Sequence, residues 1–178
     1  MTSFSVVDRP LPGVVVLECP HFTDHRGSFT KLFNADAFQA QGIDFSAAES
    51  FFTYSKTNVL RGMHYQAGKA AHDKLVCCLA GSVLDVVVDI CPSSPTFNKP
   101  FSIQLTEGCT QALLIGKGYA HGFLALEDNS CMLYYTSTVH SPDQDCGVLW
   151  SSIDFEWPLR DPLISGRDRF HPHILLQQ

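Results

Sequence analysis

The sequence contains no apolar run that approaches the ~20 residues needed to cross a bilayer, and its start lacks the basic and apolar regions of a secretory signal. These absences favour a cytoplasmic protein with no membrane partner. An excess of positive charge is also missing, because the formal net charge is −6. Proteins that bind nucleic acid usually cluster Lys and Arg, so we expect no nucleic-acid partner. A small anionic ligand such as a diphosphate remains compatible with this charge.

The spacing of the cysteines argues against two common frameworks. The seven cysteines are an odd number, and no two of them have C-x-x-C spacing. A disulfide scaffold and a structural zinc site are therefore poor explanations for them. Several lie in apolar, strand-like runs, where a thiol behaves as a small hydrophobic group. Reduced cysteines are the simplest interpretation.

A dense series of short apolar runs fills most of the sequence. With 178 residues and 45% hydrophobic content, the chain is expected to form a single domain, residues 1–178. Short strands separated by turn signals are typical of an all-β barrel or sandwich. The predicted strands are residues 14–17, 28–33, 51–55, 59–66, 75–79, 83–90, 101–105, 112–115, 122–126, 132–136 and 148–150. One helix is predicted at residues 34–41, with Asn34 as its cap, and a short helix is possible beyond Trp157.

One predicted strand carries three polar groups in the run Leu60-Arg61-Gly62-Met63-His64-Tyr65-Gln66. A guanidinium, an imidazole and an amide in a strand fit for a core indicate that they line a pocket. The alternative is an edge strand whose polar side faces solvent. Strict alternation sends Arg61 and His64 to opposite faces. A shared pocket therefore requires a bulge near Gly62 or a position at the barrel rim.

Together with two later segments, this strand is similar to the two sequence motifs of the cupins. Lys74 opens an apolar run ten residues after His64, and His121 follows the turn at residues 116–118. Metal-binding cupins usually present His-x-His and a Glu in the first motif, whereas this chain presents a single His and then a Lys. An ammonium group beside the site repels a divalent cation, so we expect no metal.

These segments, with others in the same order, make the chain resemble the dTDP-4-dehydrorhamnose 3,5-epimerase family. The similar segments are residues 24–29, 58–66, 74–76, 85–89, 94–97, 118–123, 133–134, 141–142 and 149–150. The resemblance implies a cupin-type double-stranded β-helix, or jelly-roll barrel, with a few short helices. It also implies a homodimeric isomerase without a cofactor, which epimerises a nucleotide-diphosphate 4-keto-6-deoxy sugar at C3, C5 or both in deoxysugar biosynthesis.

The resemblance assigns catalytic roles to four residues. His64 matches the base that removes a proton beside the C4 ketone, and Asp168 matches the carboxylate that orients it. Tyr134 matches the acid that returns a proton from the other face. Lys74, together with His121, is expected near the enolate oxygen, where donors stabilise the developing charge. Each role has a structural alternative: a core histidine, a packed aromatic or a solvated carboxylate.

The resemblance also indicates how the substrate is bound. Arg26, Arg61 and Arg167 are expected to hold the diphosphate, since guanidinium groups match phosphate oxygens. The other residues expected to bind the nucleotide sugar are Lys31, Glu49, Phe51, His140 and Asp145. The first four depart from the family pattern, which has an amide pair at the positions of Glu49 and Phe51. Because an amide pair is replaced by a carboxylate and a phenyl ring, we hypothesise a nucleotide other than dTDP, such as CDP, or a different sugar.

Two other functions remain open from the sequence. One is a metal-free sugar 3,4-ketoisomerase of the cupin type, which moves hydrogen between carbons and produces a ketone at C3. The other is a cupin that binds a sugar without catalysis. Asp85 and Asp89 share one strand face and are interpreted as structural or turn-capping, and Tyr135 is predicted on the face opposite Tyr134.

Overall fold

The computed structural model describes residues 3–108 and 110–174. Its strands are β1 (Ser5–Leu11), β2 (Val14–Glu18), β3 (His21–Asp24), β4 (Gly27–Thr30), β5 (Glu49–Ser55), β6 (Leu60–Gln66), β7 (Lys74–Ala80), β8 (Ser82–Asp89), β9 (Pro100–Thr106), β10 (Gln111–Ile115), β11 (Tyr119–Ala125), β12 (Ser130–Thr136) and β13 (Asp145–Gly147). The helices are α1 (Ala35–Ala40) and α2 (Gly166–Arg169), with short 3-10 turns η1 (Gly68–Ala70), η2 (Pro142–Gln144) and η3 (Trp150–Ser152). Neither α-helix in these two ranges has the length or hydropathy of a membrane span.

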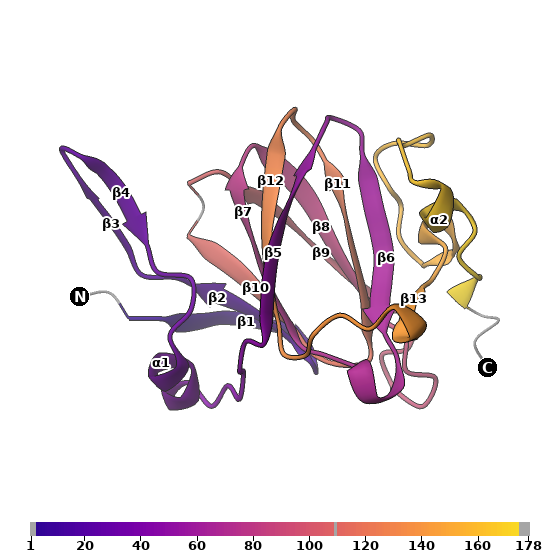
Figure 1. Ribbon diagram of the computed structural model, residues 1–178, viewed down its shortest axis with the longest axis horizontal. Helices are drawn as coiled ribbons and strands as arrows, with labels where there is room; N and C mark the ends of the chain where they lie inside the picture. The colour runs from indigo at the N-terminus through magenta and orange to yellow at the C-terminus, as the bar shows by residue number, and fades with distance from the viewer. Residues whose placement is uncertain (1–2, 109, 175–178) are drawn as a thin grey trace.

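Two antiparallel sheets form the body of the molecule (Figure 1). One sheet has the order β1-β2-β10-β7-β12-β5, and the other has the order β13-β6-β11-β8-β9. From β5 onward, successive strands mostly alternate between the two sheets, which is the connectivity of a jelly roll. The predicted cupin-type fold is confirmed. The chain therefore encloses a space between two layers, where a ligand can bind.

Alternation of apolar side chains gives each sheet two buried faces. Val87 and Met132 belong to the cluster between the sheets. On the outer side of the six-stranded sheet, Phe38 of α1 packs in a second cluster. On the outer side of the five-stranded sheet, Trp157 and Ile174 of the C-terminal segment complete a third cluster. The tail that carries α2 is thus held against the barrel by apolar burial.

A bulge in β6 corrects the alternation of its side chains. His64 pairs with His121 of β11, but Arg61 pairs with Phe123, so Gly62 and Met63 together oppose one residue. Gly62 has φ +136°, and a Cβ there would lie 2.6 Å from the Cα of Gly122. The predicted bulge is confirmed, and it lets Arg61 and His64 line the same cavity.

The hairpin of β3 and β4 extends away from the barrel, on the side opposite α2 (Figure 1). These two strands pair with each other in a separate two-stranded sheet. The predicted helix is confirmed as α1, with the Asn34 side chain accepting a hydrogen bond from the amide of Ala37. Both features lie upstream of the strands that form the cavity.

The predicted strand at residues 148–150 is wrong. Val148 still exchanges backbone hydrogen bonds with Met63, at 3.0 and 3.3 Å, but the next amide, of Leu149, bonds to Pro172. The chain therefore leaves the sheet after β13 and turns at η3. The prediction also missed β1 and β3, because their mostly exposed side chains show no apolar alternation.

Candidate active site

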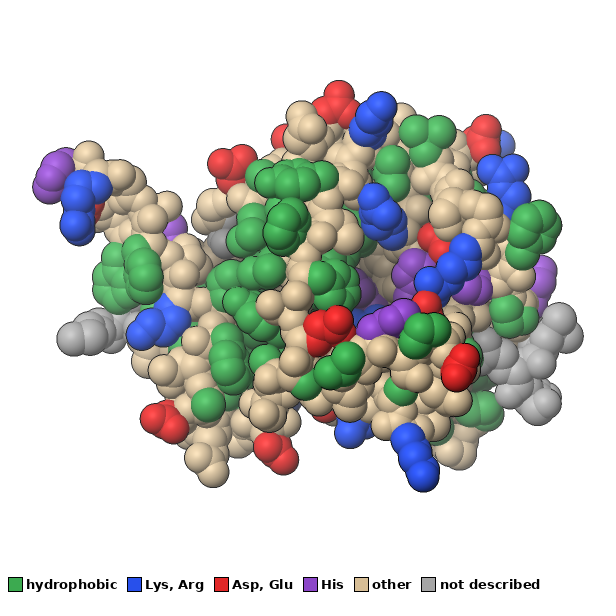
Figure 2. All heavy atoms as spheres, in the orientation of Figure 1, with side chains coloured by type: hydrophobic (Ala, Val, Ile, Leu, Met, Phe, Trp, Pro, Cys, Tyr) green, Lys and Arg blue, Asp and Glu red, His purple; other side chains and the backbone are tan. Residues whose placement is uncertain are grey.

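A cavity of about 550 Å³ opens between the two sheets. Figure 2 shows a hollow near the centre of one face, surrounded by basic, acidic and histidine side chains. Most of the predicted site residues line this cavity: Glu49, Phe51, Arg61, His64, Lys74, His121, Tyr134, His140, Asp145, Arg167 and Asp168. They come from strands of both sheets and from the tail around α2. Residues distant in sequence thus line the same cavity.

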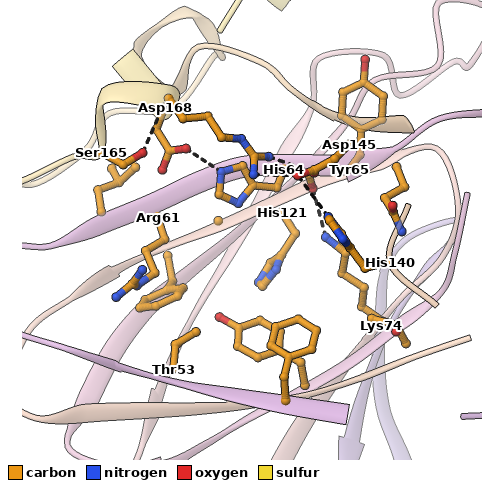
Figure 3. Close-up of a pocket in the computed structure, with 18 of the residues that line it drawn as sticks. Thr53, Arg61, His64, Tyr65, Lys74, His121, His140, Asp145, Ser165 and Asp168 are labelled. Atoms are coloured by element: carbon orange, nitrogen blue, oxygen red, sulfur yellow. Dashed lines mark hydrogen bonds and ion pairs between the residues drawn. The ribbon is translucent and has the colours of Figure 1, made fainter. Parts of the chain in front are cut away.

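His64 and Asp168 form the first ionisable pair of the cavity (Figure 3). His64 Nε2 lies 2.7 Å from Asp168 Oδ1, and Asp168 Oδ2 accepts from the amide of Gly62 at 3.3 Å. Burial raises the pKa of Asp168, but the hydrogen bond and charge of His64 outweigh it, and the pKa is lowered. An ionised Asp168 accepts the Nε2 proton, so neutral His64 has a free Nδ1 that can act as a base.

His121 and Asp85 form a second pair deeper in the wall. His121 Nε2 lies 2.8 Å from Asp85 Oδ2, and both side chains are almost wholly buried. The interpretation of Asp85 as merely structural is therefore incomplete, because it holds a histidine that lines the cavity. Asp89 does cap a turn: its carboxylate accepts from the amide of Cys91 at 2.9 Å and from the hydroxyl of Thr96 at 2.6 Å.

Tyr134 lies on β12, in the sheet opposite the one that carries His64. Its ring stacks on that of Phe51, with centroids 4.7 Å apart, and meets the edge of His121 at 6.1 Å. Burial raises the pKa of Tyr134 above its ordinary value, so the phenol keeps its proton at neutral pH. Tyr135 packs on the other face of the sheet, as predicted. An acid and a base therefore line one cavity from different sheets.

Lys74 places an ammonium group between these elements. Its Nζ donates to the backbone oxygen of His64 at 3.1 Å. Burial lowers the pKa of Lys74 to about 8, although the charges of Asp145 and Asp85 raise it. Lys74 is therefore mostly cationic at neutral pH and can stabilise an anionic oxygen in the cavity.

A network of charges surrounds another part of the cavity. Arg167 makes two contacts with Asp145, at 2.7 and 2.8 Å, and His140 Nε2 lies 3.3 Å from the same carboxylate. The amide of His140 donates to Glu49 Oε2 at 2.8 Å. Arg61 is held separately, by the hydroxyl of Ser55 and the backbone oxygen of Tyr54, both at 3.0 Å. The chain therefore offers two guanidinium groups for a diphosphate, one of them already paired.

Arg26 and Lys31 do not line the cavity of their own chain. Arg26 lies at the tip of the β3–β4 hairpin, is largely exposed and pairs with Asp24 at 2.6 Å. Lys31 follows the same hairpin and is also exposed. The projection of this hairpin, which sequence patterns do not reveal, separates both residues from the other predicted ligands (Figure 1).

The sequence analysis missed several residues of the site. Thr53 and His72 line the cavity, and His171 packs edge-on against His64 with ring centroids 5.6 Å apart. Gln66 also lines it, as the amide of its strand predicted. Proximity to Lys74 in sequence was the one available signal for His72. Thr53 and His171 are polar residues whose contacts depend on long-range pairing.

Three potential metal-ligand atoms, from His64, Asp168 and His171, lie within 4.8 Å of one another among the described residues. The 2.7 Å separation of His64 Nε2 and Asp168 Oδ1 is that of a direct hydrogen bond. Two ligand atoms of a tetrahedral zinc ion lie about 3.3 Å apart. A metal ion would have to break the bond that orients His64, so this arrangement favours proton transfer.

Comparison with known proteins identifies close relatives of the chain. A family model described as dTDP-4-dehydrorhamnose 3,5-epimerase matches residues 8–175. The enzyme of that name from Shigella flexneri is 40% identical over 167 residues, which cover 92% of each chain. The structure of such an enzyme from Bacillus anthracis, with TDP and PPi bound, has a TM-score of 0.92 at 32% identity and covers 96% of this chain and 99% of its own. A Legionella pneumophila epimerase in complex with dTDP-4-keto-L-rhamnose has a TM-score of 0.92 at 28% identity, covering 98% and 95%.

Proposed function

The chain belongs to the dTDP-4-dehydrorhamnose 3,5-epimerase family, and from this premise we propose the reaction that its cavity performs. The protein is an isomerase that epimerises a nucleotide-diphosphate 4-keto-6-deoxy sugar at C3, C5 or both in deoxysugar biosynthesis. The observation that carries this proposal is the placement of His64, oriented by Asp168, and Tyr134 on opposite sheets around one cavity. Binding alone has no need of a base and an acid on two walls.

The proposed reaction begins at the C–H bond beside the C4 ketone. Nδ1 of His64 removes the proton, and the electrons of the C–H bond pass to the ketone oxygen. Asp168 stabilises the resulting imidazolium. Lys74 donates to the enolate oxygen, where its effect grows with the charge. His121 Nε2 is held by Asp85, so His121 donates there from Nδ1 only when both ring nitrogens carry protons. Tyr134 then protonates the carbon from the opposite face, which inverts its configuration.

We propose a homodimer as the assembly that completes the site. The β3–β4 hairpin carries Phe22 and Phe29, both substantially exposed, and Arg26 lies beyond reach of its own cavity. β5 is an edge strand whose Phe52 and Tyr54 side chains are each 62% exposed. Exposed edges and apolar side chains of this kind support pairing between copies. In such a dimer, Arg26 of the partner subunit would reach the diphosphate, and Lys31 of the partner subunit would reach the nucleotide or the sugar.

The residues around Glu49 support a preference for a nucleotide other than dTDP. An amide both donates and accepts hydrogen bonds, whereas the Glu49 carboxylate only accepts and Phe51 does neither. Glu49 is also engaged by the amide of His140. CDP is one nucleotide that would present a different pattern of donors and acceptors to this region.

We also propose that residues 1–178 act as a single domain in the cytoplasm. The three apolar clusters share strands of the same two sheets, which supports one cooperative unit. Cys91, Cys131 and Cys146 have free thiols, as expected in a reducing compartment.

Turnover of the 4-keto-6-deoxyglucose derivatives of dTDP, CDP and GDP in deuterated water tests the proposal. NMR of the products should show inverted, deuterated carbon at C3, C5 or both. A ketone at C3 would indicate a ketoisomerase instead, and binding without exchange would indicate a non-catalytic protein. His64→Ala should abolish exchange, whereas Tyr134→Phe should retain exchange and lose inversion. A clear preference for the dTDP sugar would refute the altered nucleotide.

A further inference from the structure

His72 lines the cavity but has no role in the reaction proposed above. It precedes Lys74 by two residues, and its surroundings include the charged groups of Lys74, Asp145 and His140. The hydrogen bonds around its ring determine which nitrogen carries the proton. That assignment shows what the side chain offers to a ligand.

The orientation of the neighbouring Gln66 amide is fixed by the backbone. The amide N–H of Ser141 lies 2.7 Å from Gln66 Oε1, and a backbone N–H can only donate. The carbonyl end of Gln66 therefore faces Ser141, and its NH₂ end faces His72. Gln66 Nε2 lies 2.9 Å from His72 Nδ1. Since the NH₂ group donates, His72 Nδ1 must accept and cannot carry a proton.

The other ring nitrogen of His72 consequently carries the proton and has no partner. Nε2 is buried and forms no hydrogen bond with any described residue. Burial and the positive charge of Lys74 lower the pKa of His72 to about 4, which agrees with a neutral ring. A buried donor without a partner costs free energy, so its presence in the wall of a cavity requires an explanation, and a ligand that accepts its hydrogen bond provides one.

We propose that His72 is a substrate-binding residue whose Nε2–H donates to a carbonyl or hydroxyl oxygen of the nucleotide sugar. The inference rests on the proposed function and adds a specificity contact to it. A neutral N–H forms a directional hydrogen bond without contributing a charge, so it suits an uncharged oxygen. The charged guanidinium groups of Arg61 and Arg167 suit the phosphates. A carbonyl of the nucleobase and a hydroxyl of the sugar both provide such an oxygen. The hydrogen bonds from Ser141 to Gln66 and from Gln66 to His72 hold the Nε2–H donor in place.

Calorimetric titration with dTDP and dTDP-glucose, or with the CDP pair if the turnover panel favours it, tests this contact. His72→Phe keeps a flat ring without the donor and should weaken binding roughly 3- to 10-fold. His72→Gln, the matched control, retains a donor and should bind within about twofold of the wild type. Weaker binding of both ligands assigns the oxygen to the nucleobase, and weaker binding of the nucleotide sugar alone assigns it to the sugar. A folded His72→Phe protein that binds both ligands as the wild type does would overturn the proposal.

Nitrogen-15 NMR of the wild-type protein provides a test that does not depend on the folding of a variant. The His72 ring should show a protonated Nε2 and a bare Nδ1 at neutral pH, and any other state contradicts the proposal. Gln66→Glu places a carboxylate against Nδ1, should move a proton there and should weaken binding as His72→Phe does. Wild-type protein that binds the ligands but shows no turnover would refute the epimerase and leave the His72 contact standing.

Discussion

The two histidine–aspartate pairs face the same cavity from different surroundings. In the His64–Asp168 pair the side chains are 30% and 5% exposed, whereas in the His121–Asp85 pair they are 3% and 0% exposed. The first pair joins a strand to the C-terminal helix α2, and the second joins neighbouring strands β11 and β8. Their hydrogen-bond lengths are nearly the same, 2.7 and 2.8 Å. The two pairs therefore differ in solvent access and not in bond length, and in the proposed reaction only the accessible His64 exchanges protons.

The largest difference between the two pairs is expected when each histidine is replaced by glutamine. His64→Gln removes the base and should lower the rate of deuterium exchange by about 10²- to 10⁴-fold. His121→Gln keeps an N–H donor on the cavity wall and should lower the exchange rate only about 10-fold. Exchange in deuterated water, followed by NMR, measures both rates. Equal losses would show that the buried pair also takes part in proton transfer.

Replacement of each aspartate should reverse the order when stability is measured. Asp85→Asn leaves a buried histidine without its ionised partner and should lower the free energy of unfolding by about 1–3 kcal/mol. Asp168→Asn affects a pair with one partly exposed member and should cost less than about 1 kcal/mol. Urea denaturation gives both values. A larger loss for Asp168→Asn would contradict the distinction between a partly exposed pair and a buried pair.

The smallest expected difference between the two pairs is in how kcat/KM falls at alkaline pH. Lys74 is charged below its pKa of about 8, so kcat/KM should fall as pH rises through that value. The charge of Asp85 raises the pKa of Lys74, and Asp85→Asn should therefore shift the limb to lower pH. The charges that act on Lys74 are those of Asp145, Asp85 and Arg167, so Asp168→Asn should leave the limb unchanged and serves as the control. A limb that moves in neither variant would mean that Lys74 does not set it.

Patterns within short segments predicted much of this architecture. Apolar alternation located most strands. The conflict between the faces of Arg61 and His64 predicted either a bulge near Gly62 or a position at the barrel rim, and the register of β6 and β11 confirms the bulge. Asn34 signalled the start of α1 because its side chain can accept from the helix backbone. The strands, the bulge and the helix cap depend on residues that are close in sequence, so the geometry of the local backbone determines them.

Contacts between distant segments were not predictable in the same way. Asp85 meets His121 only because β8 and β11 pair in one particular register. The donor state of His72 depends on an amide of Ser141, which no local pattern connects to it. The projection of the β3–β4 hairpin likewise follows from tertiary packing, and it separated Arg26 from the cavity of its own chain.

The placement of His64 and Tyr134 on separate layers has a consequence for catalysis. The gap that the sugar must fill equals the spacing of the layers, and apolar side chains such as Val87 and Met132 in the barrel interior set that spacing. In the proposed reaction, these residues, which do not line the cavity, therefore set the distance between the base and the acid. The packing of the barrel interior therefore affects the geometry of the site as well as the stability of the fold.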